Sequence, residues 1–267
     1  MSILDRVPSD AKLRSLFTEA TFGVRLFCPR CQTSHIKRSE GRYRCPKCRK
    51  PFSLKSVSWL KYSKLDLRRT WLLVVCWQKR IAFNTTAEIV GVSTITVRRW
   101  FRRFQENLVY ESPLLKEAVE MDEAFLGKKR YGNQRIVLGA YERKSGRIVV
   151  RMTKYRDQEA TDRFLLKHVA RNSMVWTDSA QCYEGIYEFF GYIHGSCNHS
   201  VFEFGPTNHA ECIWSALKRF IRRTYHHFHK EWLPQLLREF EARWNAPRLF
   251  ISPLSYLKTC LVAVPAC

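Results

Sequence analysis

Four cysteines near the N-terminus restrict the local fold more than any other feature of this chain. They form two pairs, Cys28-x-x-Cys31 and Cys45-x-x-Cys48, and 13 residues separate the pairs. A tight turn within each pair directs two sulfurs toward one point, and the proline inside each pair favours such a turn. Four thiolates at this spacing predict a closed, tetrahedral and therefore structural site for one Zn²⁺ ion.

The same cysteine pattern has a second interpretation. Two redox-active dithiols or disulfides also use Cys-x-x-Cys pairs. No signal peptide is apparent ahead of Cys28, and disulfides are rare in the cytosol. Zinc is therefore the preferred interpretation, and we expect a cytoplasmic protein.

Short predicted elements around the cysteines fit a zinc ribbon. Apolar residues recur at helical spacing over residues 9–22, and this helix should end near Gly23. Residues 35–38 and 42–44 have the pattern of two short strands, and residues 52–54 close the unit. The expected first domain, residues 1–58, consists of this helix and the ribbon.

The positive charge of the chain is concentrated in its N-terminal part. The formal net charge is +22 over 267 residues, and residues 1–110 hold 23 Lys or Arg against 7 Asp or Glu, a net of +16. Basic residues interleaved with aromatic ones predict binding to double-stranded DNA, and a solvated basic face without function is the alternative. No apolar run of about 18 residues and no amphipathic anchor occur, so no membrane association is expected.

Residues 84–103 carry a helix-turn-helix pattern. A short helix, a turn at Gly91 and a second helix capped by Ser93 follow one another. The second helix has one apolar and one basic side, which is typical of a recognition helix, although an ordinary amphipathic surface helix has the same pattern. We expect a DNA-binding domain over residues 59–110 with the following contact residues: Thr96, Arg98, Arg99, Arg102 and Arg103.

Strand and helix patterns alternate from residue 111 onward. The patterns predict strands at 118–125, 135–141, 147–153 and 174–178, and helices at 161–170, 181–190, 208–223 and 230–245. This order predicts an α/β domain over residues 111–267, in which strand ends present side chains to a cleft.

Three acidic residues of this domain lie in positions that suit metal binding. Asp122 shares a strand face with Glu120, Asp178 ends a strand, and Glu211 lies on a predicted helix. Lys218 follows Glu211 by about two helical turns on the same side, where it can hold a DNA phosphate. Two aspartates and one glutamate suit a site with two Mg²⁺ (or Mn²⁺) ions about 4 Å apart, as phosphoryl transfer requires. Taken singly, each acid is equally well explained as a helix cap, a salt-bridge partner or a surface residue.

Several motifs together resemble one known family. The chain is similar to the ISXO-like DDE transposases of bacterial insertion sequences, which also begin with a zinc ribbon and a helix-turn-helix. The following segments carry the resemblance: MDEAFLG at 121–127, WTD at 176–178, CNHS at 197–200, NHAECIWSALKR at 208–219, YHH at 225–227 and FEARWN at 240–245.

The resemblance implies a ribonuclease-H-like catalytic domain that follows the two DNA-binding domains. It implies Asp122, Asp178 and Glu211 as the catalytic and metal-binding residues. Asn208, one helical turn before Glu211, is an alternative third ligand, but a carboxylate is the stronger ligand for magnesium. His199 matches a family histidine that approaches the scissile phosphate, although a lone histidine is more often structural.

The sequence thus predicts a DNA transposase that binds the terminal repeats of its element and performs hydrolysis and strand transfer. The expected cofactors are two Mg²⁺ (or Mn²⁺) ions per catalytic site and one structural Zn²⁺. A homodimer or larger assembly on DNA follows from the need to bring two element ends together. A zinc-ribbon transcription regulator without catalysis, and a ribonuclease-H-like nuclease without joining activity, are the alternatives.

Overall fold

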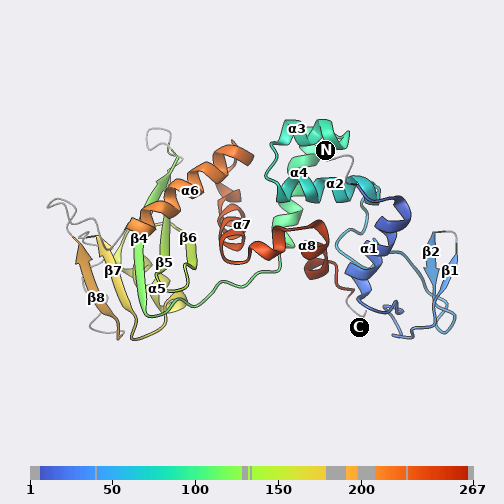
Figure 1. The fold of residues 1–267 in the computed structure, drawn as a ribbon, viewed down its shortest axis with the longest axis horizontal. Coiled ribbons are helices and arrows are strands. Elements are labelled where there is room, and N and C mark those ends of the chain that lie inside the picture. The colour runs from blue at the N-terminus through green and yellow to red at the C-terminus, as the bar shows by residue number, and fades with distance from the viewer. Residues whose placement is uncertain are drawn as a thin grey trace. The chain divides into compact units, whose positions relative to one another are not determined.

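The chain folds into two compact units, which are shown in Figure 1. Unit 1 comprises Met1–Val109 and Arg248–Cys267, and unit 2 comprises Tyr110–Pro247. The structure is a computed structural model, and it describes residues 7–39, 41–127, 132, 134–178, 191–197, 208–226 and 228–263. Within these residues, no helix combines the length and the apolar character that a bilayer crossing requires.

The first part of unit 1 is a helix followed by a small antiparallel sheet. Helix α1 (Asp10–Phe22) begins at Ser9, whose hydroxyl accepts from the Lys12 amide, and ends at Gly23, whose φ of 71° suits glycine. The sheet has the order β1-β2-β3, and its strands are β1 (Lys37–Ser39), β2 (Arg42–Arg44) and β3 (Pro51–Phe52). Phe22 packs against Phe52 at 6.0 Å between ring centroids. The predicted helix and hairpin are confirmed, and aromatic rings join them.

Three helices then form the helix-turn-helix region. They are α2 (Leu67–Gln78), α3 (Phe83–Val90) and α4 (Thr94–Glu106). Gly91 lies between α3 and α4 with a φ of 68°, and Ser93 caps α4 by accepting from the Thr96 amide. The apolar side of α4 is buried, as its period predicts, through Val97, Trp100, Phe101 and Phe104.

The C-terminal segment packs into unit 1, which differs from the expectation that residues 111–267 form one domain. The hydroxyl of Tyr256, in α8 (Pro253–Cys260), donates to the Phe104 carbonyl at 2.9 Å. The Ala263 amide donates to the Thr21 carbonyl at 2.8 Å. Helix α8 and the preceding 3₁₀ helix η6 (Pro247–Phe250) were not predicted, because the aromatic and backbone partners that hold them lie more than 150 residues away in sequence.

Unit 2 is built on a five-stranded mixed sheet with the order β6-β5-β4-β7-β8. The pairs β6-β5 and β5-β4 are antiparallel, and the pairs β4-β7 and β7-β8 are parallel. The strands are β4 (Ala118–Leu126), β5 (Arg135–Glu142), β6 (Ile148–Thr153), β7 (Met174–Asp178) and β8 (Ile193–Cys197). The four predicted strands are confirmed, and β8 was not predicted. The predicted helix 181–190 lies outside the described residues.

Helices α5 (Gln158–His168) and α6 (Asn208–Thr224) cover the sheet. Val119 and Met121 of β4 pack with Phe164 and Leu165 of α5 in one apolar core. Because successive strand residues alternate between faces, Glu120 and Asp122 point to the other face, where α6 crosses β4 and β5. The face that carries the acidic residues is therefore the face that α6 covers (Figure 1).

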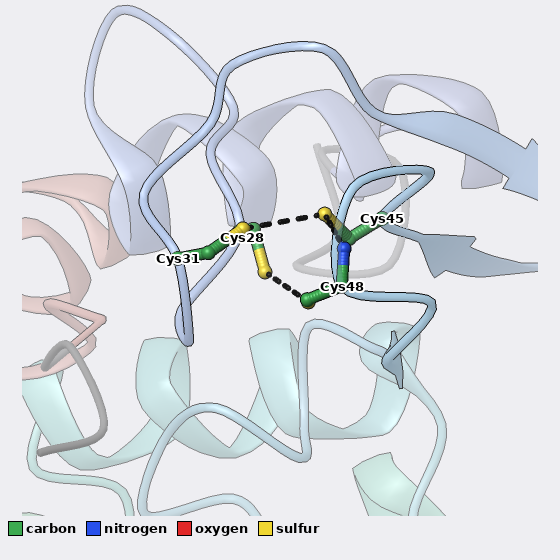
Figure 2. Close-up of side chains that lie close together, drawn as sticks. All are labelled: Cys28, Cys31, Cys45 and Cys48. Carbon is green, nitrogen blue, oxygen red and sulfur yellow. Dashed lines mark hydrogen bonds between the residues drawn. The ribbon is translucent and has the colours of Figure 1, made fainter.

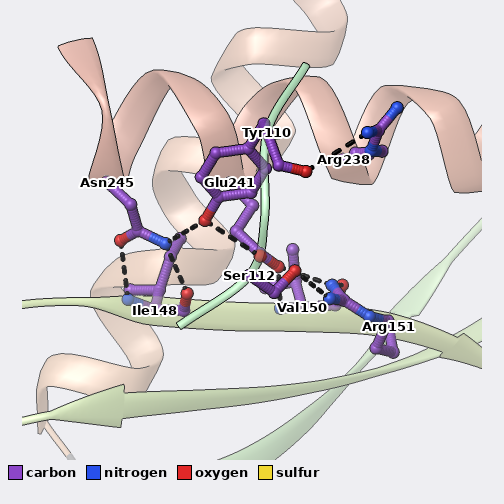
Figure 3. Close-up of polar contacts among 8 residues, drawn as sticks. All are labelled: Tyr110, Ser112, Ile148, Val150, Arg151, Arg238, Glu241 and Asn245. Atoms are coloured by element: carbon purple, nitrogen blue, oxygen red, sulfur yellow. Dashed lines mark hydrogen bonds and ion pairs between the residues drawn. The ribbon is translucent and has the colours of Figure 1, made fainter. Parts of the chain in front are cut away.

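Helix α7 (Leu233–Asn245), which follows the 3₁₀ helix η5 (Lys230–Trp232), protects the free edge of β6 (Figure 3). Glu241 accepts from the Val150 amide at 2.9 Å. The side chain of Asn245 accepts from the Ile148 amide at 2.9 Å and donates to the Ile148 carbonyl at 2.7 Å. These side chains bind backbone N–H and C=O groups of β6 that another strand would otherwise bind. Helix α7 therefore closes this side of the sheet.

Candidate metal centre

The point where β4 and β7 stop pairing brings two of the predicted acidic residues together. The hydrogen-bonded register of these parallel strands pairs Glu120 with Trp176 and then ends. Asp122 and Asp178 each follow by two residues, so both lie on the same face where the strands begin to separate. One carboxylate oxygen of Asp122 and one of Asp178 lie within 4.8 Å of each other. Two of the three predicted acidic residues therefore meet where β4 and β7 stop pairing.

The third carboxylate of this group belongs to Glu123, which the sequence did not indicate. Its oxygen lies within the same 4.8 Å of the oxygens of Asp122 and Asp178. The Glu123 side chain is 5% exposed, and its carboxylate forms an ion pair with Arg156. Strand alternation alone would place Glu123 on the opposite face from Asp122, yet one oxygen of its carboxylate reaches the same acidic group.

Trp214 of α6 holds the Asp122 carboxylate in place. Its indole Nε1–H donates to Asp122 Oδ2 at 2.7 Å. Burial raises the pKa of Asp122 to about 6, the Trp214 hydrogen bond opposes this rise, and the charges of Glu123 and Asp178 add to it. A cation would relieve the repulsion among these carboxylates, so the group is suited to bind one.

Gly139 makes the contact between Trp214 and Asp122 possible. Gly139 of β5 lies directly opposite Asp122 in the sheet register. A Cβ atom at Gly139 would lie 2.3 Å from Trp214 Cη2, so the indole lies where any other residue would place a side chain. The absence of a side chain on β5 thus lets α6 approach the site.

Glu120 anchors the first turn of α6 to the sheet. Its side chain is fully buried, and its Oε2 accepts from the amides of His209 and Ala210 at 3.0 and 3.2 Å. Its Oε1 lies 2.9 Å from His209 Nδ1 and accepts from Arg143 Nε at 2.8 Å. A helix N-terminus favours a carboxylate, because its first amides have no partner within the helix. Glu120 is therefore a positioning residue, and the sequence had indicated only its shared face with Asp122.

The other predicted residues of this site lie outside the acidic group. Glu211 and Asn208 are exposed in the first turn of α6, and the described residues include no Glu211 oxygen within the 4.8 Å group. Lys218 is exposed two turns further along α6. His199 lies outside the described residues. The structure thus brings Asp122 and Asp178 together, adds Glu123, and leaves the predicted third ligand on the neighbouring helix.

The donor set of the acidic group fits a hard divalent cation. Mg²⁺ prefers oxygen ligands and is usually held by one or two carboxylates together with water and substrate phosphates. Asp122, Asp178 and Glu123 supply only such oxygens, and all three side chains are partly exposed or lie at the strand ends. The group could therefore hold Mg²⁺ or Mn²⁺ and still leave positions for a phosphodiester.

The four cysteines of unit 1 converge on one point (Figure 2). All four are free thiols, and their sulfurs lie within 4.8 Å of one another. The closest pairs, Cys28 with Cys48 and Cys31 with Cys45, are 3.5 and 3.4 Å apart. A disulfide requires about 2.05 Å, whereas a tetrahedron with Zn–S bonds of about 2.3 Å has edges of roughly 3.8 Å. The geometry fits the predicted zinc ribbon and disfavours the disulfide alternative.

The arginines on the basic side of α4 differ in exposure, since three are exposed and the fourth contacts other residues of unit 1. Arg98, Arg99 and Arg102 are exposed. Arg103 instead lies over the rings of Trp59 and Trp100, at 5.1 and 5.0 Å from the ring centroids, and donates to the Trp59 carbonyl. Burial also lowers the pKa of Arg103. This arginine is engaged within unit 1, because the segment before α2 folds back onto α4.

Thr96 is also engaged locally. It is half-buried, and its hydroxyl lies 2.9 Å from the Ser93 hydroxyl at the helix cap. Ile95, in contrast, is 71% exposed and was not predicted as a contact residue. The exposed side of α4 therefore presents Ile95 together with the three exposed arginines.

The fold and the acidic group define an α/β domain of the ribonuclease-H-like type, with carboxylates at the point where two adjacent parallel strands stop pairing. Residues 114–245 match the family model of the ISXO2-like transposase domain. This part of the chain is therefore similar to the ISXO2-like transposase domain. The family and the fold class that the sequence motifs implied are confirmed.

Solved structures of viral integrases are similar to the chain at low sequence identity. A simian T-cell lymphotropic virus intasome in complex with a PP2A regulatory subunit matches at 12% identity and a TM-score of 0.40, over 66% of this chain and 68% of that chain. The catalytic core of BIV integrase and that of HTLV-2 integrase with magnesium match at 12% identity over 50% of this chain. Their TM-scores are 0.36 and 0.35, and the matched regions cover 86% and 87% of those two integrase chains. No curated protein matches the sequence.

Proposed function

We propose that this protein is a DNA transposase that cuts and joins DNA through the carboxylates of β4 and β7. The observation that carries the proposal is the convergence of Asp122 and Asp178 in a transposase-family domain. Hydrolysis at an element end and attack of the freed 3′-hydroxyl on target DNA differ only in the nucleophile. One site therefore serves both steps.

The residues of unit 2 have distinct roles in this proposal. Asp122, Asp178 and a third ligand would hold two Mg²⁺ (or Mn²⁺) ions, which would polarise the phosphodiester and activate the attacking hydroxyl. Trp214 fixes the orientation of the Asp122 carboxylate through its indole N–H. Glu120 fixes the helix that carries Trp214. Lys218 is exposed on that helix and would hold a DNA phosphate.

The third ligand is proposed to be Glu211. Glu123 is already paired with Arg156, and using it as a ligand would separate that ion pair. Glu211 lies one helical turn before Trp214, which contacts Asp122. Asn208 is the weaker candidate, because an amide oxygen carries no charge. Glu211→Gln should weaken Mn²⁺ binding more than Glu123→Gln, measured by titration calorimetry, and the reverse order would assign the role to Glu123.

DNA recognition is proposed for unit 1. The zinc ribbon and the exposed arginines of α4 would bind the terminal inverted repeats, with phosphates held by arginine and bases read near the start of α4. Phosphate contacts release counterions, so the affinity should fall steeply with salt concentration. Pairing of two element ends would require a homodimer or a larger assembly on chromosomal DNA in the bacterial cytoplasm.

The decisive experiment uses labelled duplexes taken from the DNA on either side of the gene. Asp122→Ala and Asp178→Ala should retain DNA binding and lose strand cleavage by roughly 100-fold or more, since several kcal/mol of transition-state stabilisation are removed. Glu159→Ala is the matched control, because this acid is 74% exposed on α5 and pairs only with Arg163. Unchanged cleavage in both aspartate variants would refute the proposal.

The two rival functions give different results in the same assay. A transcription regulator would bind the duplexes and cleave none of them, even with Mg²⁺ or Mn²⁺ present. A nuclease without joining activity would release cleaved ends but would give no recombinant products with a target plasmid. Only a transposase joins the labelled ends to the plasmid.

A further inference from the structure

A basic hollow lies in unit 2 at the C-terminal half of α6. Its volume is about 500 Å³, and its lining comes from the end of β4, the start of β5, α6 and the segment that leads into α7. Pockets of about 300–1,000 Å³ are the size class that holds small ligands or parts of larger ones. The hollow contains none of the carboxylates described above.

Four cationic side chains surround this hollow: Arg135, Lys218, Arg222 and Lys230. Within the described parts of the chain, none of the four lies within 4.0 Å of a carboxylate oxygen. Arg151 and Arg156, elsewhere in unit 2, are both paired with buried glutamates. Uncompensated positive charge gathered around one hollow creates a potential that attracts an anion.

The interior of the hollow is apolar. Leu126, Ile221 and Leu233 line it and are at most 9% exposed, and Phe228 lines it half-buried. A purely ionic ligand such as free phosphate would leave this apolar wall without a partner. A ligand with a flat apolar part and a negative charge suits both the apolar wall and the cationic side chains around it. A nucleotide has this composition.

The hollow lies at a defined distance from the acidic group. Lys218 and Arg222 follow Trp214 by four and eight residues on α6, which corresponds to about 6 and 12 Å along the helix. Trp214 contacts Asp122. With a rise of about 3.4 Å per nucleotide along one strand, the hollow is two to four nucleotides from the acidic group.

We propose that the basic hollow binds one unstacked nucleotide of the DNA strand, two to four positions from the bond that is cut. The phosphates lie at Lys218, Arg222 and Lys230, and the base lies against the apolar wall next to Phe228. This inference rests on the proposed function, since it names how that substrate is held. Extrusion of a base costs a few kcal/mol, and stacking on an aromatic side chain returns about 1–3 kcal/mol.

The test places 2-aminopurine, which fluoresces when it is unstacked, at single positions of an element-end duplex. The full-length protein is added without divalent metal, so that no strand is cut. Fluorescence should rise several-fold at one position two to four nucleotides from the cleavage point. Phe228→Ala should abolish this rise, whereas Tyr155→Ala, which removes a 53% exposed aromatic side chain outside the hollow, should leave it unchanged.

Charge variants in α6 and η5 supply the second arm. Arg222→Ala and Lys230→Ala should reduce the fluorescence rise and slow strand cleavage about ten-fold, whereas Arg219→Ala and Arg223→Ala should match the wild type. The two control arginines are exposed on α6 but do not line the hollow. Equal behaviour of all four variants, or no fluorescence rise at any position, would overturn the inference.

The two proposals fail in different ways. If Asp122→Ala stops cleavage while the variants of the hollow cut normally, the transposase stands and the nucleotide site is wrong. If the wild type cuts no element-end duplex, both are wrong.

Discussion

Trp214 and Asp122, 92 residues apart in sequence, are joined by a 2.7 Å hydrogen bond from the indole N–H to Oδ2. The bond connects the helix that covers the sheet to the strand that carries the acidic residue. It exists because Gly139 offers no side chain where the indole lies. The position of the Asp122 carboxylate therefore depends on a helix and on the neighbouring strand.

Removing the indole donor should impair the site without unfolding the domain. Trp214→Phe keeps an aromatic ring over Gly139 but leaves Asp122 without this donor. A hydrogen bond to a charged group contributes about 1.5–3 kcal/mol, so strand cleavage should fall about 10- to 100-fold. Trp244→Phe is the control, because Trp244 donates to the Gly146 carbonyl. Equal cleavage by both variants would show that the bond does not matter for activity.

Adding one methyl group at Gly139 should destabilise unit 2. Gly139→Ala forces an overlap with Trp214, and such overpacking costs about 1–3 kcal/mol. Thermal unfolding should show a lower Tm. Because the clash involves a single partner, the penalty of Gly139→Ala should shrink in a Trp214→Leu background. Strictly additive losses in that double-mutant cycle would contradict the proposed clash.

Neighbouring arginines of α4 should have different roles. Arg103→Ala removes a guanidinium that is held by two tryptophans and a carbonyl, and it should reduce the free energy of unfolding by about 1–3 kcal/mol. Arg102 is 56% exposed and pairs only with Glu106. Arg102→Ala should leave stability within about 0.5 kcal/mol and weaken DNA binding instead. Denaturation curves and binding isotherms at one salt concentration measure both quantities, and the opposite pattern would place Arg103 on the DNA.

Ile95 should contribute to sequence recognition through an apolar contact. It lies exposed in the first turn of α4, where a recognition helix meets base edges, and the thymine methyl is the apolar group of the major groove. Replacing the contacted thymine by uracil removes one methyl group. The affinity of the wild type should then fall about four-fold, which corresponds to the free energy of burying one such group. Ile95→Ala should bind both duplexes equally and unfold like the wild type. A uracil effect that persists in Ile95→Ala would exclude the contact.

Zinc should be required for the ribbon but not for unit 2. Cys45→Ser should lower the zinc content from one ion per chain to none and abolish specific DNA binding, because a structural zinc supplies much of the folding free energy of such a small unit. Cys212→Ser is the control, since this cysteine is free and exposed on α6. Elemental analysis and DNA-binding isotherms report the two effects, and a full zinc content in Cys45→Ser would refute the four-thiolate site.

Local patterns in the sequence determined several features correctly. The spacing of the four cysteines predicted their convergence, because two short turns fix most of that geometry. Periods of two and 3.6 residues predicted the strands β4 to β7 and the helices α4 and α6 to within a few residues. The strand patterns and the acidic residues in them predicted that Asp122 and Asp178 belong to one site, and the structure brings these two carboxylates together.

Other features depended on contacts between distant segments, and no short pattern contains them. The folded sheet brought Glu123 to the acidic group, and the Trp59 carbonyl and ring hold Arg103 away from the exposed face of α4. Residues 248–267 joined unit 1 through backbone and aromatic contacts with α1, α2 and α4. The sequence by itself thus determined which side chains are candidates for binding a divalent metal, zinc or DNA, since that depends on side-chain chemistry and local period. Only the tertiary structure decided which of them meet, because burial, strand register and the space left by a glycine arise from the packing of the whole chain.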